Sequence, residues 1–280
     1  MGKKTKRLFR EVLCKNNKRG HQAAVSLRLV KACHYPRLLE LVLHPDARVR
    51  ARLCSTLGEL GGYFDSGPRL TPLGIPALLQ RLHHDPKPRV RAAAAQGLSH
   101  QVRPGMLPAL CIAAQDSSKK VRQGVCHALG MGLWESGVTL PQKRQVQAVF
   151  LCFLADPDAY VREWAAFYIH CEGCSLDSPE IRAALWRLVD DTKDAVQAEA
   201  CATLGLLGDR AIVPYLIRQF ETGTVWSWNL DAAAKLSDPA SLPMLQNLRS
   251  GYRKKHGFYK SVTETIKAIK KASPKSTRLQ

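Results

Sequence analysis

The stretch Asp191–Leu216, DTKDAVQAEACATLGLLGDRAIVPYL, contains one helix, a Gly-Asp turn and the start of a second helix. Its first part has the spacing of a single apolar helix face, at Val196, Ala200, Cys201 and Leu204. Gly208 is expected to end this helix, and Asp209 to cap the next one. A helix pair of this size cannot bury both apolar faces alone, so it requires neighbours like itself.

The same unit recurs along the chain when it is aligned on its valine. The aligned valines are Val49, Val90, Val121, Val161, Val196 and, more weakly, Val225. Five positions later we expect core residues at Cys54, Ala95, Cys126, Ala166, Cys201 and Leu230, with the cysteines as free thiols. The preceding helices share a proline that suits a first helical turn, at Pro76, Pro108, Pro214 and Pro243. Repetition at this period is typical of an α-solenoid.

These repeats resemble HEAT repeats, in particular the bacterial phycobilisome-lyase-like type. The segment Asp116–Gly130, DSSKKVRQGVCHALG, matches the pattern of an aspartate, a later Val-Arg pair and an Ala-Leu-Gly ending. The resemblance covers roughly residues 36–249 and implies an all-α, right-handed α-solenoid of about six to seven helix pairs. It implies little about activity, because the family includes scaffolds, lyases, hydroxylases and DNA glycosylases.

The resemblance also gives a structural role to charged residues that recur in each repeat. In HEAT repeats, the arginine after the valine and the aspartate five residues before it commonly form a ladder of pairs between repeats. The arginines here are Arg50, Arg91, Arg122 and Arg162, and the aspartates are Asp85, Asp116, Asp156 and Asp191. We expect these residues to pair, because buried arginine is rarely left without a partner.

The net charge of +19 is unevenly distributed. Residues 1–31 contribute +9 and residues 32–122 contribute +7, whereas residues 123–248 contribute −6 and residues 249–280 contribute +9. Such asymmetry favours a polyanionic partner, most simply nucleic acid. The alternative is that the basic ends only keep a scaffold soluble.

Positions one before and three after each valine lie on one face of the second helix of each pair. The HEAT resemblance places that helix on the concave surface. The basic candidates at the starts of these helices are Arg48, Arg52, Lys87, Arg89, Lys119 and Lys120. The aromatic candidates are Tyr160, Trp164, Tyr168 and Trp228. A basic track leading to aromatic rings would bind a phosphate backbone and stack bases, unless the rings pack against an adjacent helix instead.

We therefore predict a non-catalytic protein that binds DNA or RNA through phosphate contacts. One alternative is a HEAT-like alkylpurine DNA glycosylase, because Trp226, Trp228 and Asp231 lie together in the sequence, but no catalytic residue can be assigned. A phycobilin-lyase-like role is a further option without an assignable residue. The remaining alternative is a scaffold with a protein partner in the concave groove. The phosphate loop and the H-E-x-x-H zinc motif do not occur in the sequence.

The only close cysteine pair, Cys171 and Cys174, follows His170. Three potential ligands are too few for a structural zinc site, so we expect no metal there and no cofactor elsewhere. The sequence contains no apolar run of about 18 residues, and its basic start lacks the apolar core of a signal peptide. We therefore expect no membrane contact and a cytoplasmic location.

The expected organisation has four parts. Residues 1–35 form basic capping helices near 5–15 and 21–33, residues 36–250 form the solenoid, residues 251–272 a basic C-terminal helix and residues 273–280 a disordered tail. Within the solenoid, the segment 240–250 is expected to be a helix without a partner.

Overall fold

The computed structural model describes residues 2–14, 16–27, 34–60, 74–171, 176–223, 225–254 and 256–272. Within these ranges the chain is all-α, and short 3-10 turns precede three of its helices. The predicted all-α architecture of HEAT-type helix pairs is thereby confirmed. The chain divides into two compact units, residues 1–149 and 150–280, and each is described by itself.

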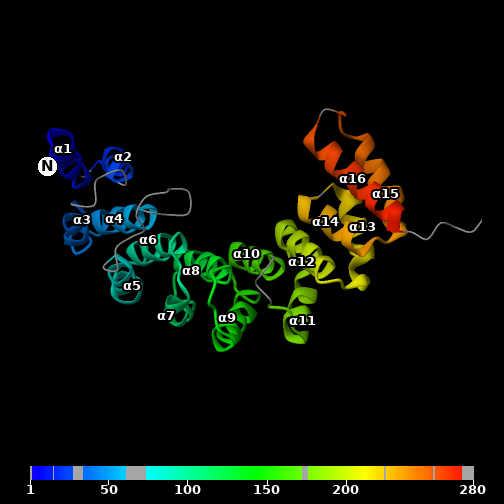
Figure 1. The fold of residues 1–280 in the computed structure, drawn as a ribbon, viewed down its shortest axis with the longest axis horizontal. Helices are drawn as coiled ribbons and strands as arrows, with labels where there is room; N and C mark the ends of the chain where they lie inside the picture. The colour runs from blue at the N-terminus through cyan, green and yellow to red at the C-terminus, as the bar shows by residue number, and fades with distance from the viewer. Residues whose placement is uncertain are drawn as a thin grey trace, which may run out of the picture. The chain divides into compact units, whose positions relative to one another are not determined.

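The first unit is built from successive helix pairs, whose second members we call B helices (Figure 1). Its helices are α1 (Lys3–Val12), α2 (Asn17–Leu27), α3 (Tyr35–Leu41), α4 (Ala47–Glu59), α5 (Gly74–His84), α6 (Pro88–Ser99), α7 (Leu107–Ala113), α8 (Lys119–Gly132) and most of α9 (Leu140–Phe153). The B helices α2, α4, α6 and α8 pack on one another in order, while α3, α5 and α7 pack on the B helix of their own pair.

The second unit repeats this arrangement. Its helices are α10 (Ala159–His170), α11 (Pro179–Leu188), α12 (Asp194–Leu206), α13 (Val213–Thr222), α14 (Ser227–Leu236), α15 (Leu242–Ser250) and α16 (Gly257–Ala272). The B helices α10, α12, α14 and α16 pack in order. The segment 240–250 is therefore not alone, because α16 packs on both α14 and α15 and completes a further pair. Its buried Val262, Ile266 and Ile269 supply the apolar face that this packing requires.

The repeat alignment correctly predicted the core. Val49, Val90, Val121, Val161 and Val196 are buried, and so are all six residues five positions after the aligned valines. Val225 is only half-buried, because it precedes the first residue of α14. The three core cysteines are buried free thiols, as predicted, and burial raises the pKa of Cys54 and of Cys201 to about 12. They are therefore inert packing residues.

Charged side chains join one repeat to the next. Arg50 Nε lies 2.6 Å from Asp85 Oδ2, Arg91 Nε lies 2.6 Å from Asp116 Oδ2, and Arg162 Nε lies 2.7 Å from Asp191 Oδ2. Each arginine also donates to a backbone carbonyl in the turn before its own helix, and so does Arg122, to Asp116 and Ser117. Each aspartate also accepts a hydrogen bond from the backbone N–H two residues ahead of it, as shown for Asp85, Asp116, Asp156 and Asp191. Asp85, Asp116 and Asp191 thus link an arginine of the preceding repeat to the turn that starts the next B helix.

Two glycine residues set the distance between the B helices α4 and α6. A Cβ atom on Gly97 of α6 would lie 2.6 Å from the Cys54 carbonyl oxygen of α4, and one on Gly58 would lie 2.1 Å from Gly97 Cα. The two helices therefore meet at backbone contact, which no larger residue permits without moving them apart.

Candidate functional site

Exposed cations occupy the starts of successive B helices in the first unit. Lys87 is the N-cap residue of α6 and Arg89 lies in its first turn, while Lys119 and Lys120 are the first two residues of α8. All four are exposed. Because α4, α6 and α8 pack in order, these residues form a row from one helix start to the next, which we call the basic row.

Arg48, at the start of α4, extends the basic row only in part. Its side chain is 42% exposed and pairs with Asp46, with 2.8 Å between Nη2 and Oδ2. Hydrogen bonds from the side chain and the backbone N–H of Arg48 lower the pKa of Asp46 to about 2. The charge of Arg48 is therefore partly neutralised within its own turn.

Arg52 does not belong to the exposed surface. It is buried, and its Nη1 donates to the carbonyl oxygens of Val12 at 2.7 Å and Cys14 at 3.1 Å. These are orphan acceptors at the C-terminal end of α1, where a cation is favoured. The expectation that Arg52 lines a basic groove is wrong, because the N-terminal helix pair covers this turn of α4.

The basic row opposes the electrostatics of the helices that carry it. A helix N-terminus is positive, so cations in the first turn cost roughly 0.3–1 kcal/mol each at low ionic strength. Neither α6 nor α8 has an acidic residue in its first turn, whereas α11 and α12 of the second unit begin with Glu180 and Asp194. The Lys87 and Ser118 N–H groups already donate to Asp85 and Asp116, so the exposed cations of the basic row, rather than these N–H groups, are what the two termini offer to an anion.

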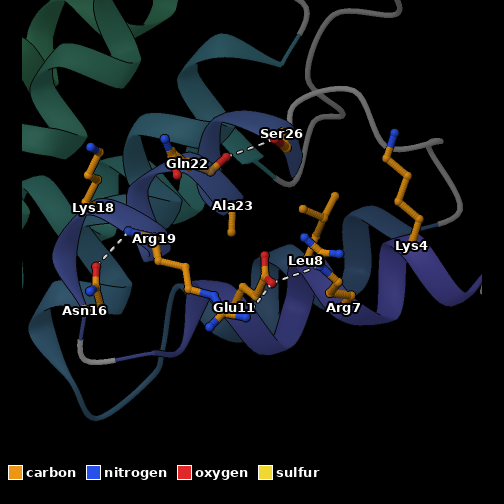
Figure 2. Close-up of a pocket in the computed structure, with 10 residues that line it drawn as sticks. All are labelled: Lys4, Arg7, Leu8, Glu11, Asn16, Lys18, Arg19, Gln22, Ala23 and Ser26. Carbon is orange, nitrogen blue, oxygen red and sulfur yellow. Dashed lines mark hydrogen bonds and ion pairs between the residues drawn. The ribbon is translucent and has the colours of Figure 1, made fainter.

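A second basic surface lies between α1 and α2, which form a groove of about 750 Å³ (Figure 2). Figure 2 shows Arg7 of α1 and Arg19 of α2 converging on Glu11, with Arg7 Nε at 2.9 Å and Arg19 Nη2 at 2.8 Å from Oε1. Lys4 and Lys18 also line the groove. Glu11 therefore holds two guanidinium groups in place, and the four cations exceed the single carboxylate.

The aromatic candidates lie in the second unit, on α10 and α14. Tyr160 and Trp228 are 42% and 37% exposed, and Trp164 is half-buried. Tyr168 is buried, with its ring centroid 6.5 Å from that of Phe150 and 5.3 Å from that of Phe167. The expectation that Tyr168 stacks on a base is therefore wrong, because its ring belongs to the core.

The residues that suggested a glycosylase lie at the start of α14 and have different neighbours. Trp228 contacts Phe167 and His170, at centroid distances of 5.5 Å from each. Asp231 instead lines a groove between α14 and α16, together with Lys260 and Glu264. Trp226 is 50% exposed at the N-cap of α14.

One group of polar residues was not predicted. Glu199 of α12 and Glu163 and His170 of α10 lie near Trp228, and Asn229 next to it is fully buried. Glu199 stands three positions after Val196, the same repeat position as Trp164 and Trp228. The repeat alignment therefore contained the signal that could have found it.

Asn229 fixes the start of α14. Its Oδ1 accepts the Trp226 N–H at 2.9 Å, and its Nδ2 donates to the Ala198 carbonyl oxygen and to Gln219 Oε1 at 3.0 and 2.8 Å. One buried amide thereby ties α14 to both α12 and α13, and it positions the neighbouring tryptophan.

Within the described residues, no three His, Cys, Asp or Glu side chains form a group that could hold a metal ion. Cys174 lies outside the described residues, so the expectation for the Cys171–Cys174 pair stays a prediction. Across the same ranges, none of the helices is both long and apolar enough to cross a bilayer.

Comparison with known proteins agrees with this architecture. In sequence, the chain is 26% identical over 165 residues to Protein YibA of Escherichia coli K12, a match that spans 57% of this chain and 55% of YibA. The chain thus matches about half the length of this relative. The X-ray structure of YibA superposes with a TM-score of 0.74 at 21% identity, covering 97% of this chain and 93% of that one.

An engineered protein superposes with a TM-score of 0.55 at 15% identity, covering 96% of this chain and 82% of its own. At these identities the structural likenesses show the fold alone. The family model for HEAT repeats matches residues 75–170 and 146–237, together more than half of the chain. The chain therefore belongs to the HEAT-repeat family.

Proposed function

We propose that the first unit binds the phosphate backbone of nucleic acid through the basic row, without chemistry on the nucleic acid. The observation that carries this proposal is the position of four exposed cations at the starts of the packed helices α6 and α8. Cations at positive helix ends are unfavourable unless a carboxylate offsets them, and the carboxylates before these helices, Asp85 and Asp116, pair with Arg50 and Arg91 instead. Such a local conflict is typical of a functional surface. Residues 1–122 carry +16, which agrees with a polyanionic partner.

The α1–α2 groove supplies further cations of the same unit. Arginine pairs bidentately with phosphate, and here Arg7 and Arg19 are held in place by Glu11. Phosphate contacts fix position and affinity but do not read the sequence of the nucleic acid. The proposed protein therefore binds many sequences with similar affinity, and more weakly as salt rises.

The test is a triple variant of the basic row, Lys87→Gln, Arg89→Gln and Lys120→Gln, in the full chain. Affinity for a short labelled DNA duplex, its single strand and the matching RNA is measured by fluorescence anisotropy at moderate salt. We expect the triple variant to bind every probe about tenfold or more weakly, because three phosphate contacts are lost.

The matched control removes three positive charges from the same unit, away from the basic row: Arg37→Gln, Lys143→Gln and Arg144→Gln. These residues lie on α3 and α9. The control has the same net charge as the triple variant, so it separates position from overall charge. If the control weakens binding as much as the triple variant does, the basic row is not the site. If no probe binds the parent chain, the nucleic-acid proposal fails altogether.

A further inference from the structure

The B-helix face of the second unit carries an acid–aromatic cluster, defined as Glu163, Trp164, Phe167, His170, Glu199 and Trp228. Three B helices contribute to it, α10, α12 and α14. Its rings form a continuous series, with centroid distances of 5.1 Å from Trp164 to Phe167 and 5.5 Å from Phe167 to Trp228. The exposed part of Trp228 connects the cluster to solvent.

Two carboxylates in the cluster repel each other, and within the part of the chain that the structure describes neither is paired with an arginine or a lysine. Glu163 is half-buried, and its pKa is raised by burial and by the charge of Glu199. Among the described residues, the only basic side chain paired with Glu199 is His170, whose Nε2 lies 3.7 Å from Oε2. That distance exceeds a hydrogen bond.

Buried polar atoms in the cluster also lack hydrogen bonds. The Glu199 side chain is 9% exposed and the His170 side chain 4% exposed, and Glu199 Oε2 and His170 Nε2 have no hydrogen-bond partner. Buried polar atoms are nearly always hydrogen-bonded, so such an acceptor beside a second carboxylate requires an explanation. A donor that carries positive charge would satisfy the acceptor and relieve the repulsion at once.

The rings add a second attraction for the same kind of ligand. The face of a tryptophan or phenylalanine ring attracts an ammonium or guanidinium group, and tryptophan does so most strongly. Carboxylates flanked by such rings therefore suit an organic cation. The buried hydrogen bonds of Asn229 to Trp226, Ala198 and Gln219 fix the start of α14, the helix that carries Trp228.

We propose that the acid–aromatic cluster binds a lysine or arginine side chain of a partner protein. The charge of the cluster itself identifies the partner's chemistry: it holds two carboxylates, and among the described residues the basic side chain beside them is one histidine. The site is independent of the basic row, which lies in the other unit and attracts the opposite charge. The chain thereby has one surface for a polyanion and another for a basic segment of a protein.

The test uses a short acetylated glycine–arginine peptide and a matched peptide in which citrulline replaces arginine. Citrulline keeps the shape of arginine but carries no charge. Both are titrated into the full chain at moderate salt by isothermal calorimetry. We expect the arginine peptide to bind about tenfold more tightly, since charge-assisted hydrogen bonds are about twice as strong as neutral ones. The variants Glu199→Gln and Glu163→Gln should each remove most of that preference, and Trp228→Leu should weaken binding of the arginine peptide.

The matched control is Glu221→Gln, which removes one negative charge at an exposed position of α13 in the same unit. It should leave the preference unchanged. Glu199 is buried, so Glu199→Gln can fail to fold. In that case the peptide preference of Glu163→Gln, a change at a half-buried position, tests the proposal. Equal affinity for the two peptides overturns the proposal, as does an equal loss in Glu163→Gln and Glu221→Gln. Concentration-dependent self-association of the parent that Glu163→Gln abolishes would also overturn it, because the occupant would then be a second copy of this chain.

Discussion

Asp85 shows how much a single repeated residue contributes to this fold. Its buried carboxylate lies 2.6 Å from Arg50 Nε and 3.4 Å from Arg81 Nη1, and it accepts the Lys87 N–H at 3.0 Å. It therefore connects α4, α5 and the start of α6. Breaking a buried pair by removing one partner leaves an uncompensated charge, which costs more than the pair itself contributes.

We accordingly expect Asp85→Asn to lower the free energy of unfolding by about 3–5 kcal/mol, because Arg50 loses its charged partner while remaining buried. Urea denaturation followed by circular dichroism measures the change. The control Asp231→Asn, at an exposed position of α14, should change stability by no more than about 0.5 kcal/mol. A similar loss of unfolding free energy in the two variants would show that Asp85 contributes no more to stability than an exposed aspartate.

The same aspartates make stability depend on pH. Burial raises the pKa of Asp85, Asp116 and Asp191, but hydrogen bonds from their arginines and from backbone N–H groups outweigh it, so each pKa lies below its ordinary value. A pKa lowered by folding contributes stability above the unfolded-state value, near 3.9, that is lost as pH falls through the folded-state value.

We expect the melting temperature to fall on acidification below about pH 4, and the fall to be smaller in Asp85→Asn, which has one such group fewer. Thermal melts of parent and variant between neutral pH and about pH 3 test this. A parallel fall in both proteins would contradict the assignment.

At the scale of the helix, the sequence predicted the repeat and its core positions. Apolar periodicity, aspartates before the B helices and prolines in first turns are local signals, and they identified five buried valines and the six buried residues that follow the aligned valines by five positions. Which side of a helix is covered is not a local property. Arg48 and Arg52 share a face of α4, yet only Arg52 is buried, because α1 ends beside it.

The residues of the candidate site were also predictable only in part. The four cations of the basic row were identified from repeat position, because charged residues at helix starts are seldom buried. Tyr168 was wrongly predicted to stack on a base, because its burial depends on Phe150, which lies on another helix, α9. Glu199 was missed although it shares the repeat position of Trp164 and Trp228, because the sequence does not show that its Oε2 atom is buried without a hydrogen bond.

Packing between B helices leads to a prediction at this scale. Alanine normally stabilises a helix relative to glycine, by about 1 kcal/mol. Gly97→Ala should instead destabilise the chain by about 1–3 kcal/mol, because its Cβ would lie 2.6 Å from the Cys54 carbonyl oxygen and α4 and α6 would have to separate.

The control is Gly105→Ala, where a Cβ would meet no atom within 4 Å. It should leave the denaturation midpoint nearly unchanged. A stabilised Gly97→Ala protein would mean that the helices are not in backbone contact.

The basic row gives a second prediction for the helices. Lys87→Gln with Arg89→Gln removes two cations from the positive end of α6, so the free energy of unfolding should rise by about 0.3–1 kcal/mol for each charge at low ionic strength. Nucleic-acid binding should weaken in the same protein. A loss of both stability and binding would instead indicate that the cations support the fold.

At the scale of the whole molecule, two compact units carry different surfaces. The first unit contains the basic row and the α1–α2 groove, and the second contains the acid–aromatic cluster. Repeat proteins allow this division, since each repeat contacts only its neighbours and surface residues vary without disturbing the stack. The HEAT framework determines the fold, and the two proposed binding surfaces lie in different units.

The most direct test of this account is the salt dependence of nucleic-acid binding by the full chain. The logarithm of the affinity for a DNA duplex, plotted against the logarithm of salt concentration, has a slope that counts phosphate contacts, at about 0.9 per contact. We predict a steep slope for the parent, reduced by about one unit for each of Lys87→Gln, Arg89→Gln and Lys120→Gln, and unchanged in Arg37→Gln. A parent slope near zero, or an equal reduction in Arg37→Gln, would contradict phosphate binding by the basic row.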